Sequence, residues 1–463
     1  MDNTYETDTI AAIATAPGEA GIGIVRVSGA NSLEIIRELY RDRNGTKRSV
    51  FITKMLYYGT LEGNEGNVLD EALCTFMKGP NSYTGEDVVE IQCHGGSASV
   101  SEILKECMFL GARLAEAGEF TKRAFLRGRI DLAQAEAVMD IISAKTGRSL
   151  NAAVGQLSGK ISKSVKEIMD IEVELIAFIE AGIDFPEHDI EELTEERIKE
   201  GLINSKNILE KLRAGFEEGR LIKDGISTAI VGKPNVGKSS LLNALINDSK
   251  AIVTDVPGTT RDIIEETLII DGVLVKLLDT AGLRHTDDVV ESIGVERTKK
   301  AIEEADLVLM VLDGSSKPTI QDRDIIELFK DKKVIIVKNK IDLGNNQEMD
   351  RFIRSIENLG VILVSTKNEI GIETLEQAIR KLVEQGTASS SGNLPVTNAR
   401  HRELIEKAYL NICKAVEALQ IGVPLDLVSL DIRDSWECLA TLTGESITGD
   451  IATEIFSRFC IGK

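Results

Sequence analysis

The sequence of 463 residues has few aromatic side chains, no paired cysteine motif and no long apolar run. A membrane-spanning helix needs roughly 18 or more apolar residues in succession, and no stretch approaches that length. The six cysteines are scattered and form no Cys-x-x-Cys pair, which disfavours a structural zinc site or a disulfide framework. The first residues are acidic, whereas a secretory signal begins with basic ones. These features predict a cytoplasmic protein in a reducing environment.

Positive charge is also scarce. Lysine and arginine total 54 against 75 aspartates and glutamates, which gives a formal net charge of −21. Such a chain does not bind nucleic acid non-specifically, so any contact with RNA requires a local basic patch or a partner. The basic cluster at 122–129 could touch a phosphate backbone, but by itself it is a weak signal for nucleic-acid binding.

The apolar periodicity divides the chain into four segments. Residues 1–120 alternate short apolar runs with helical patterns, which predicts a mixed α/β domain. Segment 121–220 shows helical spacing, and segment 386–463 returns to it after a flexible linker. Segment 221–385 repeats strand, loop and helix, as in a doubly wound parallel sheet. We therefore predict a Ras-like α/β domain inserted into an all-α domain that resumes behind it.

Two local patterns sharpen this prediction. Asp131 and Gln134 have the spacing of a capping box, and a helical run follows them to about Ala181. Asp271-Gly272 separates two apolar runs, which predicts a hairpin and one antiparallel strand at the edge of the sheet.

The segment 232–239, Gly-Lys-Pro-Asn-Val-Gly-Lys-Ser, matches the phosphate-binding pattern G-x-x-x-x-G-K-[ST]. It follows the apolar run 226–231 and precedes a predicted helix, which is the context that the motif requires. Its glycines let backbone N–H groups surround phosphate oxygens, Lys238 would reach the β- and γ-phosphates, and Ser239 would ligate Mg²⁺. The alternative is a chance glycine-rich turn, which the strand–helix context disfavours.

Further motifs follow in the order that a GTP site requires. Asp279 would hold Mg²⁺ through water, and Thr260 would complete its ligand shell. Asp342 selects guanine, because adenine lacks the paired N–H donors that its carboxylate accepts. Ser365-Thr-Lys367 would supply a backbone N–H to the guanine O6. The residues predicted to contact the nucleotide are Asn235, Val236, Gly237, Lys238, Ser239, Ser240, Thr254, Asp255, Val256, Pro257, Gly258, Thr259, Thr260, Asp279, Thr280, Ala281, Gly282, Asn339, Lys340, Ile341, Asp342, Ser365, Thr366 and Lys367.

The expected water-orienting glutamine is missing. Leu283 stands where many GTPases have that glutamine, so another group must orient the water and neutralise charge. Carbonyl oxygens beside the phosphates would form a seat for a monovalent cation; the alternative is that Asn235 is only a turn residue. The predicted ligands of the cation are Asn235, Thr254, Val256 and Thr259. Glu291 is the predicted water-orienting acid, with Asp287 and Asp288 as competitors.

With these motifs the chain resembles the MnmE (TrmE) family of tRNA-modification GTPases over essentially its whole length. Segments outside the GTPase motifs make the resemblance specific: 21–29, 83–90, 118–125 and the carboxyl-terminal 456–463. The resemblance implies GTP hydrolysis that potassium stimulates, with dimerisation of the GTPase domains across the nucleotides. It implies that a homodimer, in a heterotetramer with the flavoprotein MnmG, adds an aminomethyl or carboxymethylaminomethyl group at C5 of the tRNA wobble uridine. tRNA would bind mainly through the partner.

The resemblance also implies a one-carbon donor, 5-formyltetrahydrofolate or a related tetrahydrofolate, bound by the amino-terminal domain. Its residues would be Arg26, Glu90, Arg129 and Lys463. Arginine and lysine suit the carboxylates of a folate, and Glu90 suits the N–H donors of a pterin ring. The alternative for Arg26 and Arg129 is a solvated surface position.

Cys460 would take part in the modification chemistry, according to the same resemblance. Its alternative role is that of a small buried hydrophobe. A second class of function also stays open, namely a regulatory GTP switch that binds RNA or the ribosome without one-carbon chemistry.

Overall fold

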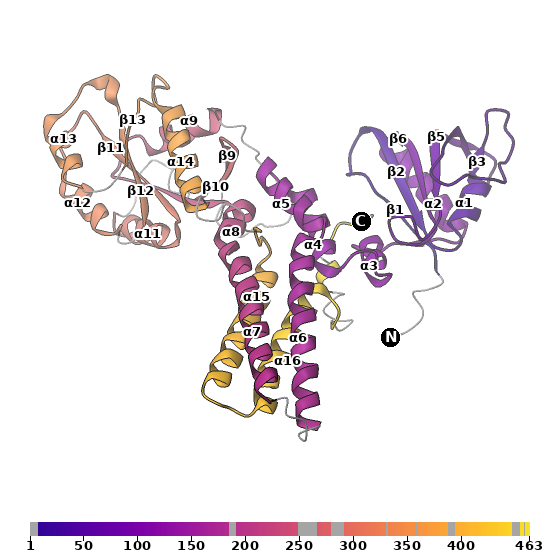
Figure 1. The fold of residues 1–463 in the computed structure, drawn as a ribbon. Coiled ribbons are helices and arrows are strands. Elements are labelled where there is room, and N and C mark those ends of the chain that lie inside the picture. Colours follow the sequence, from indigo (N-terminus) through magenta and orange to yellow (C-terminus); the bar gives the residue numbers. More distant parts are fainter. Residues whose placement is uncertain are drawn as a thin grey trace. The chain divides into compact units, whose positions relative to one another are not determined.

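The computed structural model describes residues 8–184, 191–248, 266–278, 291–329, 332–356, 360–387, 394–446, 454–457 and 459–463 (Figure 1). The chain forms two compact units. The first comprises Met1–Met139, Gln156–Ile198 and Ala418–Lys463, and the second comprises Asp140–Gly155 and Lys199–Glu417. Within the described ranges, no helix is both long enough and apolar enough to cross a membrane.

A seven-stranded sheet of order β3-β4-β5-β6-β2-β1-β7 dominates the amino-terminal part of the first unit. Its strands are β1 (Ile10–Ile13), β2 (Ala20–Ser28), β3 (Tyr40–Arg41), β4 (Leu56–Glu62), β5 (Val68–Met77), β6 (Val88–Gly95) and β7 (Arg113–Leu114). They pair antiparallel except for β1 with β7. The helices of this part are α1 (Ser32–Leu39), α2 (Ser97–Phe109) and α3 (Glu119–Leu126).

Strand alternation divides this sheet into a covered and an open face. Val25 and Val27 of β2 are fully buried and share a core with residues of α1 and α2. Because successive side chains point to opposite faces of a strand, Arg26 lies on the other face. The exposed Leu56, Tyr58 and Leu73 of the neighbouring strands belong to that open face by the same alternation.

The helical run predicted from Asp131 to about Ala181 is instead three helices. They are α4 (Leu132–Ser143), α5 (Gly147–Leu157) and α6 (Lys160–Asp184). The capping box is confirmed: Asp131 Oδ1 accepts from Gln134 N at 2.8 Å, and Gln134 Oε1 accepts from Asp131 N at 3.0 Å. The run breaks before α6 at Gly159, whose φ of +80° leaves the helical region, so helical spacing alone overran this boundary.

Among the described residues, the helical parts also contain four further helices. They are α7 (Glu191–Ala214), α8 (Phe216–Asp224), α15 (Ala399–Gln420) and α16 (Leu425–Thr443). In the first unit α16 packs along α6, where Ser435 Oγ donates to the fully buried Glu172 Oε1 at 2.7 Å. Glu172 Oε2 is buried without a hydrogen-bond partner in the described part of the chain.

A six-stranded sheet of order β13-β12-β11-β8-β10-β9 forms the core of the second unit. Its strands are β8 (Ile226–Val231), β9 (Glu266–Ile270), β10 (Val273–Leu278), β11 (Leu307–Asp313), β12 (Lys333–Asn339) and β13 (Gly360–Leu363). All neighbours pair parallel except β9 and β10, which form the predicted hairpin around Asp271 and Gly272. The helices of this sheet are α9 (Lys238–Asp248), α11 (Glu291–Glu304), α12 (Ile320–Glu327), α13 (Gln347–Arg354) and α14 (Ile372–Thr387).

Separate apolar cores on the two faces of this sheet confirm the doubly wound fold. One core joins the sheet to α9 and α14, and the other joins it to α11, α12 and α13. Strand β11 is buried along six successive residues, as expected for a central parallel strand. The carboxyl ends of β8, β11, β12 and β13 therefore meet at one edge, where ligands of such sheets bind.

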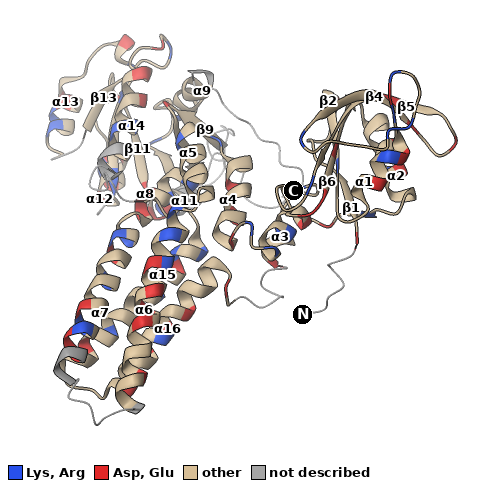
Figure 2. Cartoon of the chain, turned by 45° about the vertical axis from the view of Figure 1, so that its right-hand side comes forward, with Lys and Arg blue, Asp and Glu red and all other residues tan. Residues whose placement is uncertain are grey.

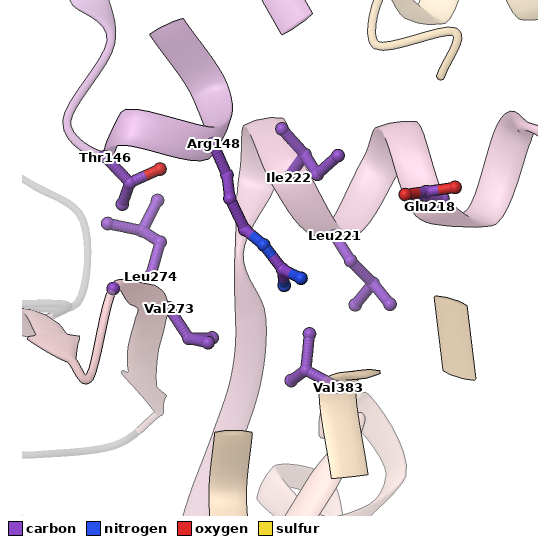
Figure 3. A pocket seen from close by; sticks show the side chains of 9 residues that line it. Thr146, Arg148, Glu218, Leu221, Ile222, Val273, Leu274 and Val383 are labelled. Carbon is purple, nitrogen blue, oxygen red and sulfur yellow. The ribbon is translucent and has the colours of Figure 1, made fainter. Parts of the chain in front are cut away.

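A pocket lies elsewhere in this unit (Figure 3). Residues of α8, of the hairpin and of α14 line it, and Arg148 of α5 extends into it beside Leu221 and Val383. None of its lining residues belongs to a predicted nucleotide motif, so it is separate from the predicted GTP site.

Candidate nucleotide site and a second site at the carboxyl-terminal segment

The phosphate loop is the turn from β8 into α9. Gly232 has φ +148°, and a Cβ there would lie 2.4 Å from the carbonyl oxygen of Val311. Gly237 has φ +99°, and a Cβ there would lie 2.2 Å from Asn339 Nδ2. Both positions thus need glycine for conformation and for space. The predicted strand–loop–helix context of the motif is confirmed.

Lys238 folds back into this loop. Its Nζ donates to the carbonyl oxygens of Gly232 at 2.8 Å and Lys233 at 2.9 Å. Burial lowers the pKa of this amine below its usual value. Ser239 follows in the first turn of α9 and is half-buried, whereas Ser240 is exposed. Lys238 and Ser239, the residues predicted to contact phosphate and Mg²⁺, therefore lie at the start of one helix.

Asn339 joins three of the predicted motifs. Its side chain is fully buried at the end of β12. Its Nδ2 donates to the carbonyl oxygen of Val236 at 2.9 Å, and its Oδ1 accepts from Thr366 N at 3.2 Å. One amide thus links the phosphate loop to the Ser365-Thr-Lys367 segment, which the structure brings together as predicted.

Asp342 presents its carboxylate at the surface of a short 3₁₀ turn, Ile341–Leu343. Its Oδ1 accepts from the buried Ser365 Oγ at 2.6 Å. This bond fixes the carboxylate while leaving it accessible, which suits recognition of the guanine edge. The preceding Lys340 has φ +62°, and its Nζ donates to the carbonyl oxygen of Asn235 at 2.6 Å.

Two acidic residues that sequence reasoning missed hold lysines of this site. Asp313, the last residue of β11, accepts from Lys340 Nζ at 2.8 Å. Burial would raise the pKa of Asp313, but hydrogen bonds from Lys340 and Ser315 lower it below the usual range. Asp322 of α12 accepts from Lys233 Nζ at 3.1 Å. The sequence offered a signal for each: Asp313 ends a buried strand, and Asp322 lies in the first turn of the helix that follows.

Part of the predicted site lies outside the described residues. This applies to Thr254, Asp255, Val256, Pro257, Gly258, Thr259, Thr260, Asp279, Thr280, Ala281, Gly282, Leu283, Asp287 and Asp288. Glu291 begins α11, and its side chain is not described. The described members of the predicted metal sites are Ser239 for Mg²⁺ and Asn235 for K⁺. Asn235 is exposed at φ +64°, the left-handed region that asparagine tolerates in turns.

A second cluster forms in the first unit around Arg26 and Glu90. Arg26 Nε donates to Glu90 Oε1 at 3.0 Å, and the side chains are 14% and 20% exposed. Arg26 is therefore not a solvated surface residue. Its NH1 also donates to the carbonyl oxygen of Gly462 at 3.2 Å, across 436 positions of sequence.

The carboxyl-terminal residues lie against the amino-terminal domain. Ile461 forms an antiparallel bridge with Ala117, and Gly118 N donates to the carbonyl oxygen of Cys460 at 3.3 Å. Gly462 has φ +91°, and a Cβ there would lie 2.3 Å from the carbonyl oxygen of Ile13. Cys460 is exposed, so its interpretation as a buried hydrophobe is wrong. Lys463 is half-buried beside this turn.

Tyr83 connects the remaining predicted residue to this cluster. The guanidinium carbons of Arg26 and Arg129 lie 5.2 Å and 5.3 Å from the centroid of its ring. Arg129 NH1 also donates to the carbonyl oxygen of Tyr83 at 2.8 Å, and the Tyr83 hydroxyl bonds Thr121 Oγ1 at 2.9 Å. The structure thus gathers the residues predicted for folate and adds Tyr83, which only its place in the 83–90 motif could have suggested.

The basic cluster at 122–129 is largely neutralised within the fold. Arg123 is 4% exposed and pairs with Asp8, Glu86 and Glu119, while Arg127 pairs with Glu86 at 2.9 Å. The acidic partners of these two arginines offset their charge, so Arg123 and Arg127 do not form a free cationic patch for nucleic acid. Basic and acidic residues also alternate along α7 and α15 in Figure 2.

The fold and the assembled motifs define a GTP-binding domain of the P-loop class within a larger chain. Family models match two parts of it: the GTP-binding protein TrmE N-terminus over residues 9–129 and the MnmE helical domain over residues 132–460. The chain is 47% identical to a tRNA modification GTPase MnmE of Clostridioides difficile, over 98% of this chain and 99% of that protein. It is 48% identical to the one of Acetivibrio thermocellus, over 99% of this chain and 100% of that protein. The chain belongs to the MnmE family of tRNA modification GTPases.

A crystal structure of Era with MgGDPNP and a segment of 16S ribosomal RNA also shows similarity. It covers 34% of this chain and 56% of that one at 29% identity, with a TM-score of 0.26. This low score adds nothing to the family assignment, which rests on the sequence relatives and family models.

Proposed function

We propose that this protein is a potassium-stimulated GTPase that acts with the flavoprotein MnmG on the wobble uridine of tRNA. The pair would add an aminomethyl or carboxymethylaminomethyl group at C5, with the carbon drawn from a tetrahydrofolate. The observation that carries the proposal is the docking of segment 459–463 beside Arg26 and Glu90, which GTP hydrolysis alone does not require.

The nucleotide half of the proposal rests on the edge of the six-stranded sheet. Lys238 stands ready to neutralise phosphate charge, and Asp342 is held for guanine by Ser365. Ser239, at the start of α9, would hold Mg²⁺ together with Thr260. Asn235, with Leu283 in the glutamine position, supports a potassium ion bound by Asn235, Thr254, Val256 and Thr259, with Glu291 orienting water.

The donor set of the second site fits 5-formyltetrahydrofolate. Glu90 offers a carboxylate to N–H donors, and Arg26 holds that carboxylate in place by pairing with it at 3.0 Å. Arg129 and Lys463 offer positive charge to carboxylates. The bound folate would supply a one-carbon unit, and the exposed thiol of Cys460 stands in the same segment as a candidate participant in its transfer.

The open sheet face supports a homodimer. Leu56, Tyr58 and Leu73 are exposed on the face that carries Arg26 and Glu90, and a second copy would bury them. The internal neutralisation of Arg123 and Arg127 leaves tRNA binding mainly to MnmG in a heterotetramer. The proposed place of action is the cytoplasm.

Turnover measurements in different salts test the nucleotide half. We expect GTP hydrolysis to be substantially faster in potassium chloride than in sodium chloride, and equal slow rates would contradict the cation mechanism. Glu291→Ala should keep GTP affinity near the wild-type value while lowering turnover by roughly tens-fold or more. Loss of binding instead would show that Glu291 is structural.

Titration of the full-length protein with 5-formyltetrahydrofolate tests the second half. We expect Arg26→Ala to weaken binding by about tenfold or more, because it leaves Glu90 unpaired. Arg37→Ala, which removes an exposed pair with Glu34, should have no effect. Nucleoside mass spectrometry of tRNA from cells without the gene then decides between the two functions. Loss of the wobble-uridine modification in these cells would support the modification function. A modification level equal to that of the wild type would support the regulatory switch.

A further inference from the structure

The segment from the end of β11 into α12 carries two acidic side chains that contact the phosphate loop, one directly and one through Lys340. Asp313 binds Lys340, whose Nζ also binds the carbonyl oxygen of Asn235. Asp322 binds Lys233 directly. The second and fourth residues of the motif, Lys233 and Asn235, are therefore both tied to this one segment.

We propose that the ion pair between Lys233 and Asp322 is a positioning device that sets the nucleotide affinity of this protein. Lys233 occupies a variable position of the phosphate-loop pattern, and the motif assigns no function to that position. The proposal concerns nucleotide binding only and does not depend on potassium, folate or MnmG.

Because the pair is largely buried, loss of either partner should be costly. Asp322 is fully buried, and the Lys233 side chain is only 15% exposed. Asp322 Oδ2 accepts from Lys233 Nζ at 3.1 Å, from Thr319 N at 2.8 Å and from Thr319 Oγ1 at 2.7 Å. Asp322 Oδ1 has no hydrogen-bond partner among the described residues. A buried carboxylate so sparsely solvated is costly without its lysine.

The backbone of Lys233 carries the effect to the phosphates. Its carbonyl oxygen is one of two acceptors of Lys238 Nζ, at 2.9 Å. The side chain of Lys233 thus fixes, through Asp322, the backbone that holds the phosphate-binding amine. If the bond to Lys233 is lost, the Asp322 side chain remains buried with only Thr319 as its partner, and the loop must shift to bring it another donor or water.

The competing interpretation is that Asp322 only caps α12. It stands three residues after Thr319, and the two form a capping box. A helix cap needs Asp322 but not Lys233. Substitution of Lys233 therefore separates the two roles, because it leaves every bond between Thr319 and Asp322 in place.

The test measures release of a fluorescent GDP analogue and its dissociation constant with the full-length protein. Lys233→Met should accelerate release of the GDP analogue by about tenfold. Lys233→Arg keeps the positive charge, so its release rate should stay within about twofold of the wild-type rate. Lys317→Met is the matched control, because Lys317 lies between β11 and α12 in an exposed pair with Glu348. It should release GDP at the wild-type rate.

A double-mutant cycle completes the experiment. Lys233→Met combined with Asp322→Asn should release GDP about as fast as the faster single variant, because the two substitutions remove one interaction. Wild-type release by Lys233→Met, or strictly multiplicative single effects, would overturn the proposal. If Asp322→Asn fails to fold, the three-way comparison of Lys233→Met, Lys233→Arg and Lys317→Met still decides it.

Discussion

The nucleotide site and the carboxyl-terminal site of this protein are assembled in different ways. In the nucleotide site, side chains at neighbouring strand ends bind backbone atoms of adjacent loops, as Asn339 does with Val236 and Thr366. In the second site, Arg26 bonds the backbone of Gly462 across 436 positions of sequence. The nucleotide site thus follows from the topology of the sheet. The second site forms only when the carboxyl-terminal segment packs against the amino-terminal domain.

The largest effect should follow from breaking the junction of the nucleotide site. Asn339→Ala leaves the carbonyl oxygen of Val236 and the N–H of Thr366 without their partner, at about 1–3 kcal/mol each. We expect GTP affinity to fall by about 100-fold, as measured by fluorescence titration. Asn368→Ala, on an exposed residue of the same loop, should bind normally. Equal affinity of all three proteins would show that the loops hold their positions without Asn339.

The next effect concerns the contact between Glu172 of α6 and Ser435 of α16, two helices far apart in the sequence. It tests whether burying the Glu172 carboxyl lowers stability at high pH. Burial raises the pKa of the Glu172 carboxyl to about 8, against an ordinary value of 4.5. Below pH 4.5 both states are protonated and the group contributes nothing. As pH rises to about 8 the unfolded carboxyl ionises first, so stability falls, and above pH 8 the full penalty remains.

Glu172→Gln removes this penalty. We expect the unfolding free energy of the variant to exceed that of the wild type by a few kcal/mol at pH 9 and by much less at pH 5. Urea unfolding followed by the fluorescence of Trp436, the one tryptophan of the chain, measures this. Glu180→Gln, on an exposed part of α6, serves as control. A difference that does not vary with pH would contradict the raised pKa.

A smaller effect should follow from displacing the carboxyl-terminal segment. Gly462→Ala places a Cβ against the carbonyl oxygen of Ile13 and strains a φ of +91°. We expect folate affinity to fall by about tenfold, with GTP affinity unchanged, in parallel titrations. Gly111→Ala is the matched control, because Gly111 has φ +103° but open space around its Cα. A loss of GTP affinity in the first variant would show that the two sites are not separable.

The smallest effect concerns Tyr83. Tyr83→Phe removes the bond to Thr121 but keeps the ring beside Arg26 and Arg129. We expect a loss of about two- to threefold in folate affinity, against about tenfold for Tyr83→Leu, since cation–π contacts stabilise by roughly 0.5–2 kcal/mol each. Isothermal titration calorimetry distinguishes these values. Equal losses would assign the whole effect to the hydroxyl.

The same comparison explains what the sequence could predict. The strand at 226–231, the hairpin at Asp271-Gly272 and the capping box at Asp131 depend on local patterns, and all three are confirmed. Asn339 and Thr366 meet because parallel strands end at one edge, which the strand order predicts. The break at Gly159 could not be predicted, because helical spacing of apolar residues continues across it.

Other features were beyond local reasoning. Nothing near Arg26 indicates that Glu90 and Gly462 are its partners, so only resemblance to a family suggested the site. The basic cluster around Arg123 is cationic in sequence, yet Glu119 of the same helix and the distant Asp8 and Glu86 pair with Arg123. The contact of Asp322 with the phosphate loop could not be predicted, because its partner Lys233 occupies a position at which the phosphate-loop pattern allows any residue.

The bond between Arg26 and Gly462 has a consequence for biosynthesis. An amino-terminal domain emerges from the ribosome first, but its second site needs a glycine made 436 residues later. At roughly 5–20 residues per second, that interval lasts about 20–90 seconds. A nascent chain can therefore complete its first sheet well before the proposed folate site is complete.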